Sequence, residues 1–210
     1  MQETGTLKQI VIATKNKGKI REIIDFYNKF RQIKWLTYQD FKSYPTVREG
    51  SKSFFENAKR KAKIISEFTK KTTLADDSGL VVDALDGAPG VTSSRYAGYN
   101  ATDSQNRQKL IRRLSKIKIP EQRTARFVCN MILWDPQDGM IASTEGICEG
   151  VIGFEEKGSG GFGYDCIFIP AGYKKTMAEL SGIEKNKISH RGRALEKLKP
   201  FFKKKLYLDQ

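Results

Sequence analysis

Two neighbouring acids, Asp76 and Asp77, follow a short apolar run and precede Ser78 and Gly79. Carboxylates at the end of a strand are hard oxygen ligands, and one or two of them can hold a divalent cation such as Mg²⁺ that keeps part of its water shell. The same residues also favour a plain turn, because Asp, Ser and Gly form local hydrogen bonds and tolerate positive φ. The following stretch 87–98, rich in glycine and serine, predicts a long loop close to the acids, and such loops often carry functional sites.

A third acid, Glu49, lies in the polar segment before the helix that a capping box from Ser53 to Glu56 predicts. A carboxylate in this position could reach Asp76 and Asp77. A single glutamate in a loop is more often plain solvated surface. Glu49 is therefore a candidate third metal ligand, with the surface interpretation left open.

The segment TKNKGK joins a strand predicted at 9–13 to an amphipathic helix predicted at 20–30. Backbone N–H groups at a helix start, the helix dipole and three lysines together favour phosphate binding. The spacing is not that of the common P-loop, and a solvated basic loop is the alternative. The candidate phosphate-binding residues are Thr14, Lys15, Asn16, Lys17, Gly18 and Lys19.

Two segments near the C-terminus have residues suited to a flat ligand. The loop 158–163 contains four glycines and Phe162, so it predicts either a flexible linker or a backbone that closes over a planar base stacked on the ring. Ser189 predicts the N-cap of a final helix that begins with His190 and Arg191. Donors at this helix start would suit a carbonyl or an anion, although a lone histidine is more often structural.

Hydrophobic periodicity supplies the remaining elements and predicts one α/β domain over residues 1–210. Further helices are expected at 54–70 and 103–114, further strands at 33–37, 123–134, 141–153 and 166–169, a hairpin turn at 135–139, and a frayed tail at 201–205.

Composition narrows the class of protein. The chain has 210 residues, with 38 Lys and Arg against 24 Asp and Glu, so its net charge is +14. This excess attracts polyanions such as nucleic acids, nucleotides or acidic lipids. Three cysteines without metal-type spacing predict reduced core residues. No apolar run resembles a signal peptide or a membrane span, so a soluble cytoplasmic protein without a membrane partner is expected.

Four blocks carry a resemblance to a known family: residues 14–19, FFENAKRKA at 54–62, the stretch 74–98, and GGFGYD at 160–165 followed by EKNKISHRGRAL at 184–195. Their order and spacing resemble the inosine triphosphate pyrophosphatase family from about residue 11 to residue 198. The resemblance implies an α/β fold with two lobes around a long twisted mixed sheet, flanking helices, a central cleft and a homodimer. It also implies hydrolysis of ITP, dITP and XTP to the monophosphate and pyrophosphate with Mg²⁺, which removes deaminated purines from the nucleotide pool.

The resemblance also implies roles for individual residues. Asp77 matches the catalytic acid and Mg²⁺ ligand, and we expect Asp76 and Glu49 to assist it in binding the metal and activating a water that attacks the α-phosphorus. Residues 14–19 match the triphosphate-binding loop. The expected substrate-binding residues are Ser78, Phe162, Gly163, Tyr164, Asp165, Lys185, His190 and Arg191. Family members often have two adjacent acids where this chain has Arg48 and Glu49, glycine in place of Lys15 and proline in place of Cys166.

Selectivity has a chemical basis. Hypoxanthine and xanthine present a carbonyl at the six position and a ring N–H, which suit a donor such as Arg191 and an acceptor such as Asp165. Adenine reverses both groups, and a site built on polar pairing can reject the wrong partner by a factor on the order of 10⁴. Two alternative functions are kept. The first is a nucleic-acid-binding module, which the absence of zinc-finger and RRM motifs from the sequence disfavours. The second is a related pyrophosphatase that acts on modified pyrimidines.

Overall fold

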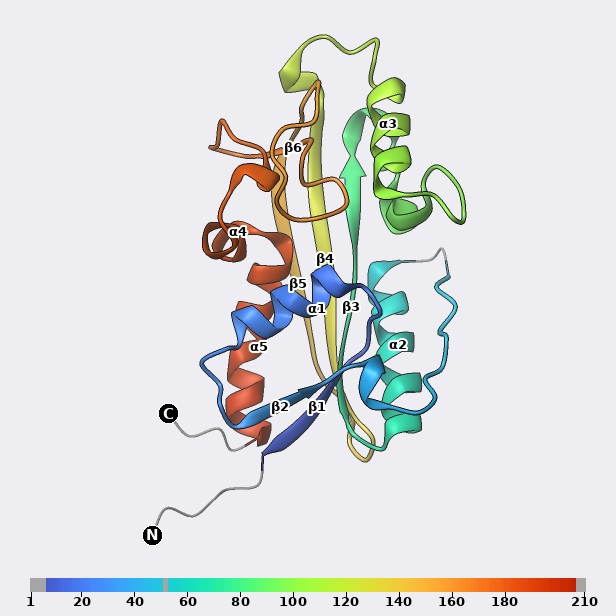
Figure 1. Ribbon diagram of the computed structural model, residues 1–210, viewed down its shortest axis with the longest axis vertical. Coiled ribbons are helices and arrows are strands. Elements are labelled where there is room, and N and C mark those ends of the chain that lie inside the picture. The colour runs from blue at the N-terminus through green and yellow to red at the C-terminus, as the bar shows by residue number, and fades with distance from the viewer. Residues whose placement is uncertain (1–6, 51–52, 207–210) are drawn as a thin grey trace. The chain divides into compact units, whose positions relative to one another are not determined.

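A six-stranded mixed sheet organises the chain, and the computed structural model describes residues 7–50 and 53–206. The strand order is β2-β1-β3-β4-β5-β6 (Figure 1). The strands are β1 (Lys8–Ile12), β2 (Ile33–Leu36), β3 (Thr72–Val82), β4 (Thr124–Asp135), β5 (Gly139–Ile152) and β6 (Phe168–Pro170). β1 pairs in parallel with β2 and β3, whereas β5 and β6 are antiparallel. The predicted α/β class and mixed sheet are confirmed, as is the hairpin, since β4 and β5 are neighbours joined by three residues.

The chain forms two compact units. The first unit contains residues 1–77, 130–145 and 194–210, and the second contains residues 78–129 and 146–193. The division falls between Asp77 and Ser78, inside β3, and it also passes through β4 and β5. Each unit is therefore assembled from separate stretches of sequence, and no single cut in the chain would separate the two.

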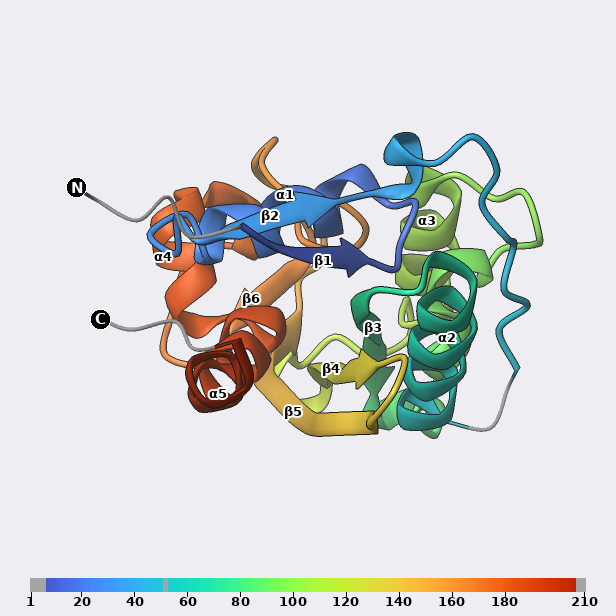
Figure 2. The same ribbon diagram turned by 90° about the horizontal axis from the view of Figure 1, so that it is seen from below.

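In the first unit, α2 (Phe54–Thr69) covers one side of the strands (Figure 2). Its start is fixed as predicted, because the Ser53 hydroxyl accepts a hydrogen bond from the Glu56 N–H at 3.1 Å. The buried side chains Ala58, Ala62 and Ile65 pack in one cluster with apolar residues of β1 and β3. Small residues on this face allow close approach, so polar side chains elsewhere on α2 can reach β3.

The other side of the first unit's strands is covered by α1 (Lys17–Phe26) and α5 (His190–Leu206). Tyr27, which ends α1, donates a hydrogen bond from its hydroxyl to the carbonyl oxygen of Leu195 at 2.7 Å. The Tyr27 ring also packs edge-on against Phe202, which is fully buried. The prediction of a frayed tail from residue 201 is therefore wrong, because an aromatic contact holds α5 to α1.

The second unit has its own apolar core. Leu110 of helix α3 (Asp103–Arg113) packs in one cluster with Leu80 and Val82 of β3 and Phe127 of β4. A short helix that the sequence did not predict, α4 (Gly182–Ile188), begins at a capping box between Ser181 and Glu184. The loop predicted at 87–98 is a 3-10 helix over Gly90–Arg95. Its Ser93 hydroxyl accepts a hydrogen bond from the Leu80 N–H at 2.9 Å, so this segment is tied to β3.

Several element boundaries differ from the prediction, and α1 differs at both ends, since it ends at Phe26 rather than at residue 30. α1 begins at Lys17 rather than at residue 20, because the Asn16 side chain accepts a hydrogen bond from the Lys19 N–H at 3.0 Å and so acts as N-cap. β6 begins two residues after the predicted strand at 166. β3 continues through Asp76 and Asp77, so neither the predicted strand end nor the alternative turn is observed there. Within the described residues, no helix has the length and apolar character needed to cross a membrane.

Candidate active site

Lys61 and Asp77 form the centre of the polar cluster in the first unit. The Lys61 ammonium lies 3.2 Å from Oδ1 of Asp77 and 2.9 Å from Oε1 of Glu49. The other oxygen of Asp77 accepts a hydrogen bond at 3.0 Å from the Asn57 amide, which also donates to the Gly50 carbonyl. Both oxygens of Asp77 are therefore fixed by α2, and its carboxylate shares one cation with Glu49.

Asp76 faces the other way. Successive side chains of a strand point to opposite sides of the sheet, so Asp77 faces α2 whereas Asp76 faces α1. Its Oδ2 lies 3.0 Å from the Lys19 ammonium, and its side chain is fully buried. Each of the two adjacent acids thus has its own lysine, and these ion pairs explain how a sequence typical of a turn can lie inside a buried strand.

The predicted trio of metal ligands is not brought together. In residues 7–50 and 53–206 no group of three His, Cys, Asp or Glu side chains is placed to hold one metal ion. Strand alternation accounts for this, because it directs Asp76 away from Asp77. The pair that does converge on a common cation is Asp77 with Glu49.

Burial and charge both act on this cluster. Burial raises the pKa of Asp77 above that of an exposed aspartate, although Lys61 and Lys19 act in the opposite direction. Burial alone would lower the pKa of Lys61, but the carboxylates of Asp77, Glu49 and Asp76 raise it above the ordinary value for lysine. Lys61 therefore stays protonated, and Asp77 is a stronger base than an exposed aspartate.

The predicted phosphate-binding segment is a helix start rather than a loop alone. Lys17, Gly18 and Lys19 form the first turn of α1. The Thr14 hydroxyl accepts a hydrogen bond from the Asn16 N–H at 3.1 Å, which orders the approach to the helix. Lys15 and Lys17 are exposed, and Lys15 lies 3.4 Å from the Thr46 hydroxyl. This geometry fits anion binding by a helix N-terminus flanked by lysines.

A second polar cluster, in the second unit, is built on Asp165. Its Oδ2 accepts a hydrogen bond from the Lys185 ammonium at 2.6 Å and another from the Phe162 N–H at 2.8 Å. Both side chains of the ion pair are buried. The Phe162 ring lies 5.0 Å from the Lys185 ammonium and 5.7 Å from the guanidinium of Arg191. Two cations therefore lie beside one half-buried aromatic ring, as base stacking with polar readout would require.

The residues around this cluster are held in place by further contacts. The guanidinium of Arg191 donates a hydrogen bond to the Ser78 hydroxyl at 2.8 Å. His190 is buried and stacks on Phe127 with ring centroids 4.7 Å apart and an interplanar angle of 11°. Tyr164 is also buried, and its hydroxyl donates to the Ser93 carbonyl at 2.8 Å. Tyr164 therefore holds the end of the glycine-containing loop against the segment Gly90–Arg95. Its predicted contact with the base stays a prediction.

The glycine-containing loop is tied to α3, contrary to the flexible loop that its composition suggests. Asp103 accepts a hydrogen bond from the Gly163 N–H at 2.8 Å, and Arg107 donates one to the Gly163 carbonyl at 2.8 Å. Arg107 also pairs with Glu156 at 2.9 Å. Gly161 has φ +72°, and a Cβ there would collide with the Asp165 carboxylate, so this position requires glycine. We call Asp103, Arg107 and Gly163 the α3 clamp.

Comparison with known proteins agrees with this geometry. Residues 10–201 match the model of the Ham1 family. The chain belongs to the Ham1 family. Proteins named dITP/XTP pyrophosphatase from Geobacillus kaustophilus and Halalkalibacterium halodurans are 48% and 46% identical to it over 192 residues, which cover 91% of this chain and 93% and 97% of theirs. The resemblance inferred from the sequence motifs is confirmed.

Solved Ham1 structures have the same fold. A HAM1 protein from Coxiella burnetii aligns with a TM-score of 0.83 at 40% identity, covering 94% of this chain and 100% of its own. The Ham1 protein of Staphylococcus aureus aligns with a TM-score of 0.81 at 36% identity, covering 94% and 99%. The mixed-sheet α/β fold is therefore that of the Ham1 family.

Several residues of the two clusters were missed by the sequence analysis. Asn57 and Lys61 are four residues apart, so they share a face of α2, and both are buried next to Ala58 and Ala62. Polar side chains interrupting an apolar helix stripe were the available signal. Asp103 and Arg107 show the same spacing on α3, but they resemble an ordinary charged helix surface, and only the tertiary contact with Gly163 distinguishes them.

Proposed function

We propose that this chain hydrolyses dITP, XTP and ITP to the monophosphate and pyrophosphate, as a cytoplasmic enzyme that removes deaminated purine nucleotides from the pool. The observation that supports this proposal most directly is the similarity to relatives named dITP/XTP pyrophosphatase. Their alignments cover 91% of this chain, with 46% and 48% of the aligned residues identical. Every candidate residue, from Thr14 to Arg191, lies inside the stretch 10–201 that matches the Ham1 family. A homodimer remains part of the proposal, on the family resemblance alone.

The first unit's cluster suits the triphosphate and a metal ion. The carboxylates of Asp77 and Glu49 both lie next to the ammonium of Lys61, so they are close to each other. Mg²⁺ is commonly held by one or two carboxylates together with substrate phosphates. These two residues would therefore hold Mg²⁺, which supplies charge neutralisation at the phosphates and lowers the pKa of a bound water. Asp77 would also orient the attacking water and accept its proton, while the start of α1 would bind phosphate oxygens.

The second unit's cluster suits the base. Phe162 offers a face for stacking, and Lys185 and Arg191 offer donors to the carbonyl at the six position of hypoxanthine or xanthine. Asp165 keeps Lys185 in place through the 2.6 Å ion pair. An adenine amino group in the same position is itself a donor and would face the donors of Lys185 and Arg191, so adenine could not accept these hydrogen bonds.

The test is a substrate panel of ITP, dITP, XTP, ATP, GTP and a modified pyrimidine triphosphate, followed by pyrophosphate release at matched Mg²⁺. We expect the deaminated purines to exceed ATP in kcat/KM by a factor on the order of 10³ or more, and chelation by EDTA to stop turnover. Comparable rates for ITP and ATP would contradict the proposed base selectivity. A preference for the pyrimidine would favour the related pyrophosphatase class, and salt-sensitive nucleic-acid binding without any hydrolysis would favour the binding module.

A further inference from the structure

The high positive charge is not explained by the two clusters, and part of it is concentrated at one place. Residues 107–118 contain six Lys and Arg and no acid. Arg107 and Lys109 are used internally, on Gly163 and Tyr96. The other four, Arg112, Arg113, Lys116 and Lys118, are exposed, and none of them forms an ion pair with a residue that the structure describes. Exposed cations that form no ion pair with a described residue favour a positive potential on the surface around the end of α3.

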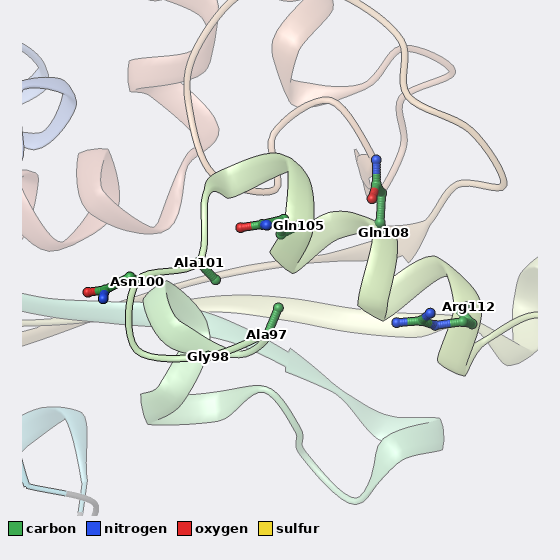
Figure 3. Close-up of a pocket in the computed structure, with 7 residues that line it drawn as sticks. All are labelled: Ala97, Gly98, Asn100, Ala101, Gln105, Gln108 and Arg112. Atoms are coloured by element: carbon green, nitrogen blue, oxygen red, sulfur yellow. The ribbon is translucent and has the colours of Figure 1, made fainter.

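A pocket of about 570 Å³ lies beside these cations. One wall is the loop 97–101, and the other is the face of α3 that carries Gln105, Gln108 and Arg112 (Figure 3). These three side chains share a face because they are spaced i, i+3 and i+7. The volume lies within the range of roughly 300–1,000 Å³ typical of small-molecule sites. All of its residues belong to the second unit, and none belongs to the two clusters described above.

Both walls of this pocket are fixed in advance. The buried side chain of Asn106 accepts a hydrogen bond from the Ala97 N–H at 2.7 Å and donates one to the Ser94 carbonyl at 3.2 Å. Gln105 accepts a hydrogen bond from the Thr102 N–H at 2.8 Å as part of the capping box that starts α3. These hydrogen bonds join the loop to the helix in the absence of a ligand, so ligand binding would not include the free-energy cost of ordering the two walls.

The lining is rich in donors. The amide groups of Asn100, Gln105 and Gln108 and the guanidinium of Arg112 line the pocket, and none of the lining residues in the described part of the chain is an acid. Because the Gln105 carbonyl oxygen is engaged in the cap, its remaining capacity is to donate. Donors around one guanidinium fit the oxygens of a phosphate group.

We infer that this pocket binds a small phosphate-bearing anion, with the phosphate on Arg112, and that it is a second ligand site separate from the proposed nucleotide-hydrolysing residues. The phosphate can come from free inorganic phosphate or from a phosphate ester such as a nucleoside monophosphate.

The experiment is an amide NMR titration of the full chain with inorganic phosphate and, separately, with AMP, at constant ionic strength. We expect saturable shifts at Gly98, Ala101 and Gln105, and a dissociation constant for at least one probe that rises by about tenfold in Arg112→Gln. Arg113→Gln is the matched control, because it removes the same charge one residue away from the lining. It should change the constant by less than about twofold. The tighter probe identifies the source of the phosphate.

Equal weakening in both variants would overturn the inference, since it would mean that only diffuse charge attracts the anion. Shifts confined to residues 14–19, 61, 77, 162–165 and 185–191 would also overturn it, because the probe would then occupy only the proposed hydrolytic residues. A third contrary outcome is tight binding of a single-stranded oligonucleotide with no binding of either small probe, which would identify a nucleic-acid surface instead.

Discussion

The two polar clusters differ in how they use charge. In the first unit, three acids, Asp77, Asp76 and Glu49, are paired with two lysines, and one ammonium serves two carboxylates. In the second unit, one acid, Asp165, is paired with Lys185 beside an aromatic ring and a second cation. The first arrangement brings carboxylates together, which suits a metal ion, whereas the second places two cations beside an aromatic ring, which suits a base.

This difference separates the two parts of the proposed reaction. Metal binding and water activation need carboxylates whose charge is partly compensated, so that they can accept a cation and a proton. Selection of a base needs fixed donors with little freedom, because discrimination depends on leaving the wrong partner unpaired. Substitutions in the first cluster should therefore reduce turnover for every substrate, and substitutions in the second should change which substrate is preferred.

The largest effect is expected for Asp77→Asn. The amide keeps the shape of the side chain but cannot take a proton or bind a metal ion with the same charge, so turnover of ITP should fall by roughly 10³-fold or more. Nucleotide binding, measured by calorimetry with a non-hydrolysable analogue, should change much less. Asp138→Asn, in the exposed turn between β4 and β5, is the control. Near-normal turnover in Asp77→Asn would remove Asp77 from the catalytic role and end the distinction between the clusters.

An intermediate effect, on substrate preference and on stability, is expected for Lys185→Met. The substitution leaves the Asp165 carboxylate buried without its ammonium, which should lower the free energy of unfolding by about 3 kcal/mol. The preference for ITP over ATP should fall by roughly 10²-fold, because a donor to the base is lost. Chemical denaturation and paired kcat/KM values for the two nucleotides measure these changes.

The double variant Asp165→Asn/Lys185→Met separates the two effects. It removes both charges, so stability should recover while selectivity stays low. If selectivity recovered together with stability, Lys185 would be a structural residue only. The second unit's cluster would then not select the base through this lysine.

The smallest effect is expected for Arg107→Gln in the α3 clamp. Loss of the hydrogen bond to Gly163 should loosen the position of Phe162, so KM for ITP should rise by about fivefold while kcat stays within about twofold. Arg107→Lys should recover part of the loss, because an ammonium can still donate to the carbonyl. Arg113→Gln, on the same helix, should leave both constants unchanged. A fall in kcat with KM unchanged would show that the clamp does not act through the base-binding loop.

Local signals made much of the fold predictable. The N-caps of α2 and α5 depend on hydrogen bonds that span only three residues, Ser53 to Glu56 and Ser189 to Gly192, and both are present. The apolar periodicities of α2 and α3 and the β4–β5 hairpin are local in the same way. The start of α1 was misplaced because its cap, Asn16, was assigned to a basic loop rather than to the helix.

The sequence by itself determined which chemical groups are available: adjacent acids, a lysine-rich helix start, an aromatic residue in a glycine-containing loop, and their order along the chain. Only the tertiary structure decided which group meets which. Asp76 and Asp77 are neighbours in sequence, yet strand alternation sends one to Lys19 and the other to Lys61. Contacts of this kind depend on where two helices lie against a sheet, and no local pattern of residues encodes that placement.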